Sequence, residues 1–357
     1  MTILALETSC DETAVAIVRE GNSGSGSDLL ASEVASQIAA HEKYGGIVPE
    51  IASRNHLVYA PGLLNRAAGL AKINLSEMDA FAATSGPGLA SSLMIGASIA
   101  KGLAIGFSKP YLAVNHLEGH LLSPFFGNVK KENQIRPNIS LIVSGGHTLL
   151  VQVQALDEYT IIGRTVDDAA GEAFDKVAKL LGLGYPGGPE IESHARGGDS
   201  HRFDLPRSMP ESENFSFSGL KTAVRYLLPK IVERFCEPRK HSGVTQAPYK
   251  LDGQVLADLC ASFQQAIIDV LVCKTIAAAK KYRFDLVTVS GGVSCNQELR
   301  KQLGEACTRE GFEFKSAEPW LCTDNAAMIA FTALLRLQAG FQSDVTEEID
   351  PNLALAE

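Results

Sequence analysis

Two apolar runs joined by a short polar turn occupy residues 3 to 18, Ile3-Leu-Ala-Leu-Glu-Thr-Ser-Cys-Asp-Glu-Thr-Ala-Val-Ala-Ile-Val18. This pattern is typical of a β-hairpin, with Thr8 to Thr13 as its turn. The same shape recurs downstream, where Ile139 to Val143 precedes Ser144-Gly-Gly-His147 and a second apolar run, Leu149 to Val151. Two copies of one pattern indicate two similar lobes.

Predicted helices alternate with these strands. In the first half, residues 49 to 70 and 89 to 107 have helical composition. Small residues from Gly96 to Ala104 give the second of these helices a face that permits close packing, and we expect this face to lie in the core rather than in a subunit interface. In the second half we predict helices at 168–181, 256–281 and 296–309, a strand at 284–289, and a last helix from Thr323 or Asp324 to Gly340. Strands alternating with helices predict an α/β fold.

Composition excludes several classes of protein. The seven cysteines among 357 residues form no CxxC pair, so we expect reduced thiols and a cytoplasmic location. Residues 80 to 100 carry no charge, but Ser85-Gly-Pro-Gly88 interrupts them, so we expect a strand, a turn and a helix and no membrane partner. A net charge of -9 argues against indiscriminate binding of nucleic acid. Residues 229 to 253, rich in Pro, Lys and Arg, are predicted to be a surface insertion.

A pair of histidines four residues apart is the first candidate for chemistry. In His116-Leu-Glu-Gly-His120 both imidazoles would lie on one face of a helix, close enough to bind one metal ion. The alternative is two histidines with no shared role, and spacing does not identify a third ligand. A zinc peptidase also spaces two histidines by four, but Glu118 lies about 200° around the helix from His116, where it could not serve as that enzyme's base.

Glycine-rich turns follow apolar strands at Ser144-Gly-Gly-His147 and Ser290-Gly-Gly-Val293. Each offers backbone N–H groups with little obstruction, which suits a phosphate or a ribose, although each alone is more often a plain tight turn. The polar turn at Thr8 to Thr13 is a third element of this kind.

The predicted helix at 168–181 carries like charges on one face, at Asp168, Glu172 and Asp175, which Lys179 offsets only in part. Asp167 or Asp168 can cap this helix, whereas Asp175 lies two turns in and is a candidate for contact with a ribose or a metal. Asn296 and Asp324 both stand at predicted helix starts, where capping is the default interpretation.

Nine motifs in order make the sequence resemble the tRNA adenosine threonylcarbamoyltransferase family, whose bacterial members are called TsaD. They are Ile3-Leu-Ala-Leu-Glu-Thr-Ser-Cys-Asp-Glu-Thr-Ala14, Tyr44-Gly-Gly-Ile-Val-Pro-Glu-Ile-Ala-Ser-Arg-Asn-His56, Asn115-His-Leu-Glu-Gly-His120, Val143-Ser-Gly-Gly-His-Thr148, Asp167-Asp-Ala-Ala-Gly-Glu-Ala-Phe-Asp-Lys176, Gly184-Tyr-Pro-Gly-Gly-Pro189, Phe215-Ser-Phe-Ser-Gly-Leu-Lys221, Ser290-Gly-Gly-Val-Ser-Cys-Asn296 and Cys322-Thr-Asp-Asn325.

The resemblance implies a two-lobed actin- and hexokinase-like fold built on duplicated ribonuclease H-like domains. On that basis we expect an N-terminal lobe at 1–110, completed by a C-terminal helix at about 324–357, and a C-terminal lobe at 111–323. It also implies transfer of the threonylcarbamoyl group of threonylcarbamoyl-adenylate, with release of AMP, to the exocyclic amine of adenosine 37 in tRNAs that read codons beginning with A.

Site residues follow from the same resemblance. It implies that one divalent metal ion per subunit, iron(II) with zinc as the alternative, is held by His116, His120 and Asp324. It implies a nucleotide site formed by Val143, Ser144, Gly145, Gly146, His147, Asp175, Gly188, Glu192 and Asn296. Glu192 departs from the aspartate that many relatives carry there. It further suggests contacts to phosphate or tRNA by Ser9, Asp11 and Glu12.

The expected partners are tRNA, a homologous TsaB-like protein, a TsaE-like ATPase and an upstream enzyme that makes the adenylate. We predict that the helices at 49–70 and 89–107 bind the TsaB-like partner. Two rival functions remain open: an ATP-dependent small-molecule kinase of the same fold, and a scaffold without catalytic activity. A kinase would turn over ATP without tRNA, and retention of both histidines and Asp324 argues against a scaffold.

Overall fold

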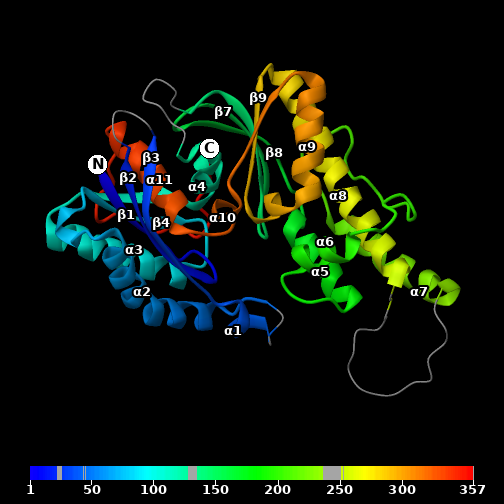
Figure 1. Cartoon of the computed structure of the whole chain (residues 1–357), viewed down its shortest axis with the longest axis horizontal. Helices are drawn as coiled ribbons and strands as arrows, with labels where there is room; N and C mark the ends of the chain where they lie inside the picture. Colours follow the sequence, from blue (N-terminus) through cyan, green and yellow to red (C-terminus); the bar gives the residue numbers. More distant parts are fainter. Residues whose placement is uncertain are drawn as a thin grey trace. The chain divides into compact units, whose positions relative to one another are not determined.

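The structure is a computed structural model that describes residues 1–21, 26–42, 44, 46–127, 135–235, 251 and 253–356. The chain forms two compact units and two five-stranded sheets (Figure 1). The first unit comprises Met1–Pro137, Val153–Thr160 and Ala317–Glu357. The second comprises Asn138–Gln152 and Ile161–Ser316.

The sheet of the first unit has the strand order β3-β2-β1-β4-β5. Its strands are β1 (Thr2–Glu7), β2 (Glu12–Glu20), β3 (Ser27–Ser36), β4 (Ala80–Gly86) and β5 (Tyr111–Asn115). β1 and β2 pair antiparallel, which confirms the first predicted hairpin, and β1 pairs parallel with β4. Every residue of β1 is buried, so this strand is the centre of the unit.

Helices cover both faces of this sheet. α2 (Pro49–Ala71) and α3 (Ala90–Phe107) pack on one face, and α11 (Ala326–Gln338) packs on the other beside α4 (His116–Leu122) (Figure 1). The small-residue face of α3 is buried in the core, as predicted, because Gly96, Ala97, Ala100 and Ala104 all point inward. The remaining short helices among the described residues of this unit are α1 (Ile38–Glu42), η2 (Leu75–Glu77), η3 (Ser123–Phe125) and α10 (Pro319–Cys322).

The boundaries of the first unit differ from the expected lobe at 1–110. The unit continues to Pro137 because β5 pairs parallel with β4 and α4 follows β5 directly. The C-terminal residues return to complete this unit, and their helix begins at Ala326, after the N-cap Asn325, whose side chain accepts a hydrogen bond from the Met328 N–H. It ends at Gln338, close to the predicted end at Gly340, and does not span the whole segment 324–357 expected to complete the lobe.

The second sheet repeats the plan of the first. Its strands are β6 (Asn138–Val143), β7 (Thr148–Ala155), β8 (Glu158–Arg164), β9 (Leu286–Ser290) and β10 (Glu313–Ser316). They belong to the second unit except for Val153–Thr160, where β7 ends and β8 begins, which belong to the first unit. Their order is β8-β7-β6-β9-β10, with β6 beside β7 as the second predicted hairpin requires. β6 pairs parallel with β9, and β9 with β10, just as β1 pairs with β4 and β4 with β5. The recurrence seen in the sequence therefore reflects two sheets of one topology.

The helices of the second unit form its hydrophobic core together with the sheet. They are α5 (Ala170–Leu181), α6 (Gly187–Ala195), α7 (Ser218–Phe235), α8 (Gly253–Tyr282), η4 (Gly292–Cys295) and α9 (Gln297–Glu310). Of the described helices, α3 and α8 are long and apolar enough to cross a membrane, judged by length and composition alone. Core helices of soluble proteins pass the same test, and α8 is mostly buried.

Within the predicted insertion, residues 229–235 continue α7, and 236–250 and 252 lie outside the described residues.

The predicted cap of α5 is wrong. Its N-cap is Ala169, which has no capping side chain, because both candidate aspartates are engaged elsewhere. Asp168 pairs with Lys176 at 2.6 Å, and Asp167 accepts hydrogen bonds from residues 216–218. Lys176 also contacts Glu172 at 2.8 Å and so offsets part of the acidic charge.

Candidate metal centre

Two histidines lie on the short helix α4 at the end of β5. The Asn115 side chain caps this helix by accepting hydrogen bonds from the N–H groups of Leu117 at 2.8 Å and Glu118 at 3.4 Å. The i, i+4 spacing then places His116 and His120 on one face, with ring centroids 4.8 Å apart. Both rings are buried, so the predicted shared face exists.

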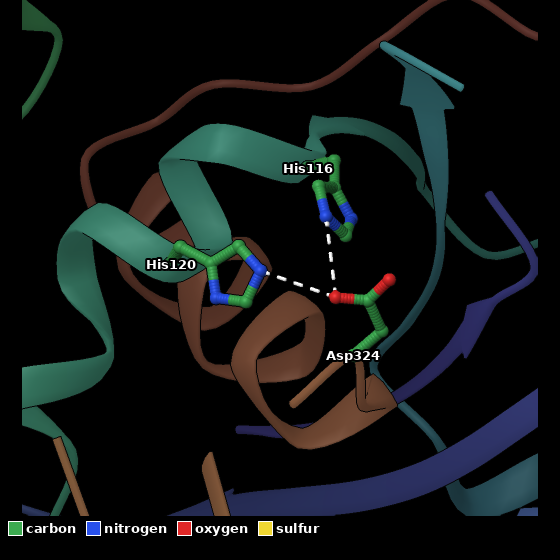
Figure 2. Close-up of side chains that lie close together, drawn as sticks. All are labelled: His116, His120 and Asp324. Carbon is green, nitrogen blue, oxygen red and sulfur yellow. Dashed lines mark hydrogen bonds and ion pairs between the residues drawn. The ribbon is translucent and has the colours of Figure 1, made fainter. Parts of the chain in front are cut away.

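Asp324 completes the group from the other end of the sequence. It directly precedes Asn325, the N-cap of α11, and α11 packs against both α4 and β5. Its Oδ1 atom lies 3.5 Å from Nε2 of His116 and 3.2 Å from Nε2 of His120 (Figure 2). The three donor atoms lie within 4.8 Å of one another. The residues that the resemblance implied as metal ligands therefore converge within the first unit.

The donor set fits a divalent metal ion. Two imidazole nitrogens and one carboxylate oxygen are the ligands of many iron(II) sites that keep open coordination positions, and zinc accepts the same donors. Both histidines direct the same ring nitrogen, Nε2, toward Asp324, as Figure 2 shows. The Asp324 side chain is partly exposed while both histidines are buried, so a substrate could approach from its side.

Nearby carboxylates control the charge of the two rings differently. Burial lowers the pKa of His116, but the carboxylates of Asp324 and Glu7 outweigh burial and raise that pKa to about 9. Burial raises the pKa of Glu7, yet the adjacent His116 makes the net shift of that pKa downward. For His120, burial prevails and its pKa is lowered. The carboxylates of Asp324 and Glu7 therefore stabilise a positive charge at the position of His116.

Sequence reasoning gave Glu7 no role. This residue is fully buried at the end of β1, and its Oε2 atom lies 3.0 Å from Nδ1 of His116. Oε2 also accepts a 2.6 Å hydrogen bond from the Thr84 hydroxyl, and Oε1 accepts a 2.5 Å bond from the Ser9 N–H. The signal that could have revealed it is a lone carboxylate at the end of an apolar strand.

The polar turn after β1 borders the same group. Ser9 and Asp11 are buried, and the Ser9 Oγ atom lies 3.3 Å from Nδ1 of His116. Burial raises the pKa of Glu12 to about 10, with further upward contributions from Asp324 and Asp11. The contact of Ser9, Asp11 and Glu12 with phosphate or tRNA stays a prediction.

Glu118 lies on α4 between the two histidines but faces another way. Its carboxylate accepts hydrogen bonds from Arg336 at 2.8 Å and from the Tyr159 hydroxyl at 3.0 Å. It is therefore held in an ion pair rather than beside the metal ligands. The peptidase interpretation lacks its base, as the helical geometry predicted.

The predicted nucleotide turns lie at one edge of the second sheet. Because β6 and β9 are parallel, the turns that follow them, at 144–147 and 290–293, meet at the same edge. A side chain at Gly291, which has φ 87°, would lie 2.5 Å from the Val143 carbonyl oxygen. The carbonyl of Ser144 accepts a 3.2 Å hydrogen bond from the Gly171 N–H, which joins the first turn to α5. Carboxyl edges of this kind are where α/β folds bind ligands.

The other predicted nucleotide residues make contacts within the second unit. Asp175 accepts a 2.7 Å hydrogen bond from the Gly187 N–H, next to Gly188 in the first turn of α6. Glu192 accepts a 2.9 Å bond from the Gln297 N–H. Asn296 caps α9, as predicted, and donates to the Gln264 side chain at 2.7 Å. These contacts gather the residues around α5, α6 and α9, and their binding of a nucleotide stays a prediction.

Comparison with known proteins agrees with the resemblance. The family profile described as tRNA N6-adenosine threonylcarbamoyltransferase, TsaD, matches residues 28–331. A protein of that name from Methylibium petroleiphilum is 45% identical, over 100% of this chain and 98% of its own length. One from Thermosipho africanus is 42% identical, over 99% of this chain and 100% of its own length. The protein of that name from Paracidovorax citrulli is 48% identical over 95% of this chain and 92% of its own.

Solved structures show the same fold at low sequence identity. Full-length HypF, in its phosphate- and nucleotide-bound form, matches with a TM-score of 0.59 at 14% identity, covering 96% of this chain and 47% of that protein. HypF from T. kodakarensis matches with a TM-score of 0.61 at 14% identity, covering 95% and 48%. The predicted α/β fold of the two-lobed actin- and hexokinase-like type is confirmed. The chain belongs to the tRNA N6-adenosine threonylcarbamoyltransferase family and is a transferase that modifies tRNA.

Proposed function

We propose that the protein transfers the threonylcarbamoyl group of threonylcarbamoyl-adenylate to the exocyclic amine of adenosine 37, in tRNAs that read codons beginning with A, and releases AMP. The observation that carries this proposal is the convergence of His116, His120 and Asp324 in a chain of this family. A centre with two imidazoles and one carboxylate suits an acyl transfer that needs its carbonyl polarised.

In this proposal His116 and His120 supply Nε2 and Asp324 supplies Oδ1 to one iron(II) ion per subunit, with zinc as the alternative. A metal ion held by these residues would supply Lewis-acid polarisation of the threonylcarbamoyl carbonyl. The buried walls formed by α4 and β1 exclude water from the inner side of the site, where both histidines and Glu7 lie. Exclusion of water strengthens the electrostatic interactions of the site and protects the activated group from hydrolysis.

The reaction itself makes modest demands on the protein. The amine nitrogen of adenosine attacks the threonylcarbamoyl carbonyl carbon, the bond from that carbon to the phosphate oxygen breaks, AMP departs with the bonding electrons, and the amine loses one proton. Because AMP is a good leaving group, the side chains need mainly to position the two substrates and to stabilise the developing negative charge.

We assign binding of the adenylate to the residues at the carboxyl edge of β6 and β9. The turn from Ser144 to His147 supports this assignment, because side chains added at Gly145 and Gly146 would meet no atom within 4 Å. Backbone N–H groups in such an open turn can approach a phosphate or a ribose closely. Asp175 lies on α5, whose Gly171 hydrogen-bonds to this turn. Gly188 and Glu192 lie on α6, which packs on α5, and Asn296 follows η4, which also contacts α5.

The partner proposal rests on exposed apolar side chains of α2 and α3, which pack against each other. Leu57, Val58, Met94 and Ile105 are all exposed on these two helices. Exposed apolar side chains on adjacent helices are a feature of protein interfaces. We assign this surface to a TsaB-like partner, with a TsaE-like ATPase and an adenylate-forming enzyme completing the system. We place the reaction in the cytoplasm, where the free thiols of all six described cysteines would persist.

A reconstitution tests the function against its rivals. Unmodified tRNA is incubated with threonine, bicarbonate, ATP, the partner proteins and this chain, then hydrolysed and analysed by mass spectrometry for the threonylcarbamoylated nucleoside. The proposal requires the modified nucleoside only when this chain is present. Phosphorylation of a small molecule without any modified nucleoside would favour the kinase. Full modification by a variant in which His116, His120 and Asp324 are all alanine would favour the scaffold.

A further inference from the structure

One fully buried carboxylate beside the metal ligands has no part in the chemistry described above. Glu7 ends the central strand β1, and the described residues include a single ion-pair partner for it, His116. Both of its oxygens are engaged, Oε1 by the Ser9 N–H at 2.5 Å and Oε2 by the Thr84 hydroxyl at 2.6 Å. Its position is therefore fixed by β1, by β4 and by the turn between β1 and β2.

This fixed carboxylate determines which nitrogen of His116 carries a proton. An ionised carboxylate can only accept, so the His116 Nδ1 atom, 3.0 Å from Glu7, must donate. In the neutral ring, the lone pair then lies on Nε2, which faces Asp324. Nε2 with a lone pair is the form of imidazole that binds a metal.

The second histidine provides an internal contrast. The Nδ1 atom of His120 is buried and has no hydrogen-bond partner among the residues that the structure describes. His120 is thus oriented by packing on α4, whereas His116 is oriented by a hydrogen-bonded carboxylate. Carboxylates placed behind a metal-binding histidine commonly fix its tautomer and increase its basicity.

We propose that Glu7 is the positioning residue of the metal centre, which holds His116 with Nε2 directed at the ion and Nδ1–H directed at its own carboxylate. It is a positioning residue and not a ligand, since its carboxylate lies on the Nδ1 side of the ring, away from the Nε2 atom that belongs to the three-donor group. Its negative charge, with that of Asp324, balances the charge of a divalent ion. This inference rests on the metal centre of the proposed function.

The substitution Glu7→Gln tests the proposal, because a glutamine cannot satisfy all three donors. If its amide NH₂ faces His116, Nδ1 must accept and the proton moves to Nε2, where it blocks the metal. If the amide faces Ser9, two N–H donors oppose each other. Loss of such a partner typically weakens metal binding about 10- to 100-fold.

The readout is Co²⁺ affinity of the metal-free full chain, followed through the visible absorption of bound cobalt. Asp258→Asn is the matched control, since Asp258 is a buried carboxylate that also accepts a backbone hydrogen bond, from Asp199 at 2.8 Å, but pairs with Arg202 instead of a histidine. We expect weaker cobalt binding in Glu7→Gln and unchanged binding in the control. Affinity within twofold of the parent in Glu7→Gln would overturn the proposal for Glu7 while leaving the metal centre intact. Failure of the parent to bind cobalt would overturn both.

A second measurement, on the parent chain, tests the predicted tautomer of His116 even if Glu7→Gln does not fold. Two-bond ¹H–¹⁵N spectra of the metal-free protein, recorded at a pH high enough for the His116 ring to be neutral, report the tautomer of each histidine ring, with His116→Gln used to assign its signals. The proposal requires His116 to carry its proton on Nδ1. A proton on Nε2 of His116 would overturn it.

Discussion

The Arg336 guanidinium donates a 2.8 Å hydrogen bond to the buried carboxylate of Glu118 and so ties α11 to α4, the helix that carries both metal-binding histidines. Tyr159 donates to the other oxygen of Glu118 at 3.0 Å, and Asp157 accepts from Arg336 at 2.9 Å. The network belongs entirely to the first unit. It fixes α4 from the side opposite to the metal ligands.

Removing the cation from this network should destabilise the first unit. We expect Arg336→Met to lower the free energy of unfolding by about 3 kcal/mol, because it leaves the buried carboxylate of Glu118 without its cation, although Tyr159 still donates to it. Arg54→Met is the control, since Arg54 pairs with Glu50 at a similar distance of 2.7 Å but both side chains are more than 70% exposed. Its effect should be below about 0.5 kcal/mol. Urea unfolding of both variants checks this, and equal effects would contradict it.

Two adjacent glycines should respond differently to alanine. Gly291 has φ 87° and lies against the Val143 carbonyl, so Gly291→Ala should cost about 1 to 3 kcal/mol and disturb the edge shared by the two glycine-rich turns. Gly292 has open space around the position of a side chain, so Gly292→Ala should have little effect. Thermal unfolding and nucleotide binding of the two variants provide the comparison. Similar behaviour of both would show that the close contact with Val143 is unimportant.

The stabilisation provided by Asp167 should depend on pH. Burial raises the pKa of Asp167, but hydrogen bonds from Ser216, Phe217 and Ser218 outweigh burial and lower that pKa. A carboxylate whose pKa is lowered by folding stabilises the protein fully above its unfolded-state pKa of about 3.9, and this is lost as pH falls through the folded pKa.

Asp167→Ala should therefore lower the free energy of unfolding at pH 7 by about 1 kcal/mol. Urea unfolding of parent and variant at several pH values should show this difference shrinking below about pH 4. A difference that stays constant from pH 7 to pH 3 would contradict the role of the ionised carboxylate.

Charge placed on α2 should disrupt the partner complex. Val58 and Tyr226 are each 71% exposed, but Val58 lies on the surface assigned to the TsaB-like partner and Tyr226 lies on α7 of the second unit. We expect Val58→Asp to weaken the complex at least tenfold, because it buries an unpaired charge at an apolar interface. Tyr226→Asp should leave binding unchanged. Isothermal titration calorimetry measures both, and an intact complex with Val58→Asp would refute the interface.

Local sequence patterns predicted the elements well but not the contacts between distant segments. The hairpin at residues 3 to 18 and the shared face of His116 and His120 follow from spacings of two and four residues. Asp324 joins them only because α11 packs against α4 and β5, across 204 residues of sequence, so its place as third ligand came from the resemblance and not from spacing.

The failures have the same origin. Asp167 and Asp168 stand where a helix cap is expected, yet Asp167 instead binds residues 216–218, about fifty positions later, and Asp168 binds Lys176. Glu7 looked like the end of an ordinary strand, because its partner His116 belongs to an element that follows β5. Local periodicity contains no information about such pairs.

The central claim is that transfer to tRNA proceeds at a metal centre held by His116, His120 and Asp324. The most direct measurement supplies preformed threonylcarbamoyl-adenylate and unmodified tRNA to the chain with its TsaB-like and TsaE-like partners, and quantifies the modified nucleoside for the parent, the metal-stripped parent and Asp324→Ala. We predict modification by the parent, loss of at least 100-fold on stripping and in Asp324→Ala, and recovery with added iron(II) in the stripped parent alone. Equal modification by all three samples would contradict the account.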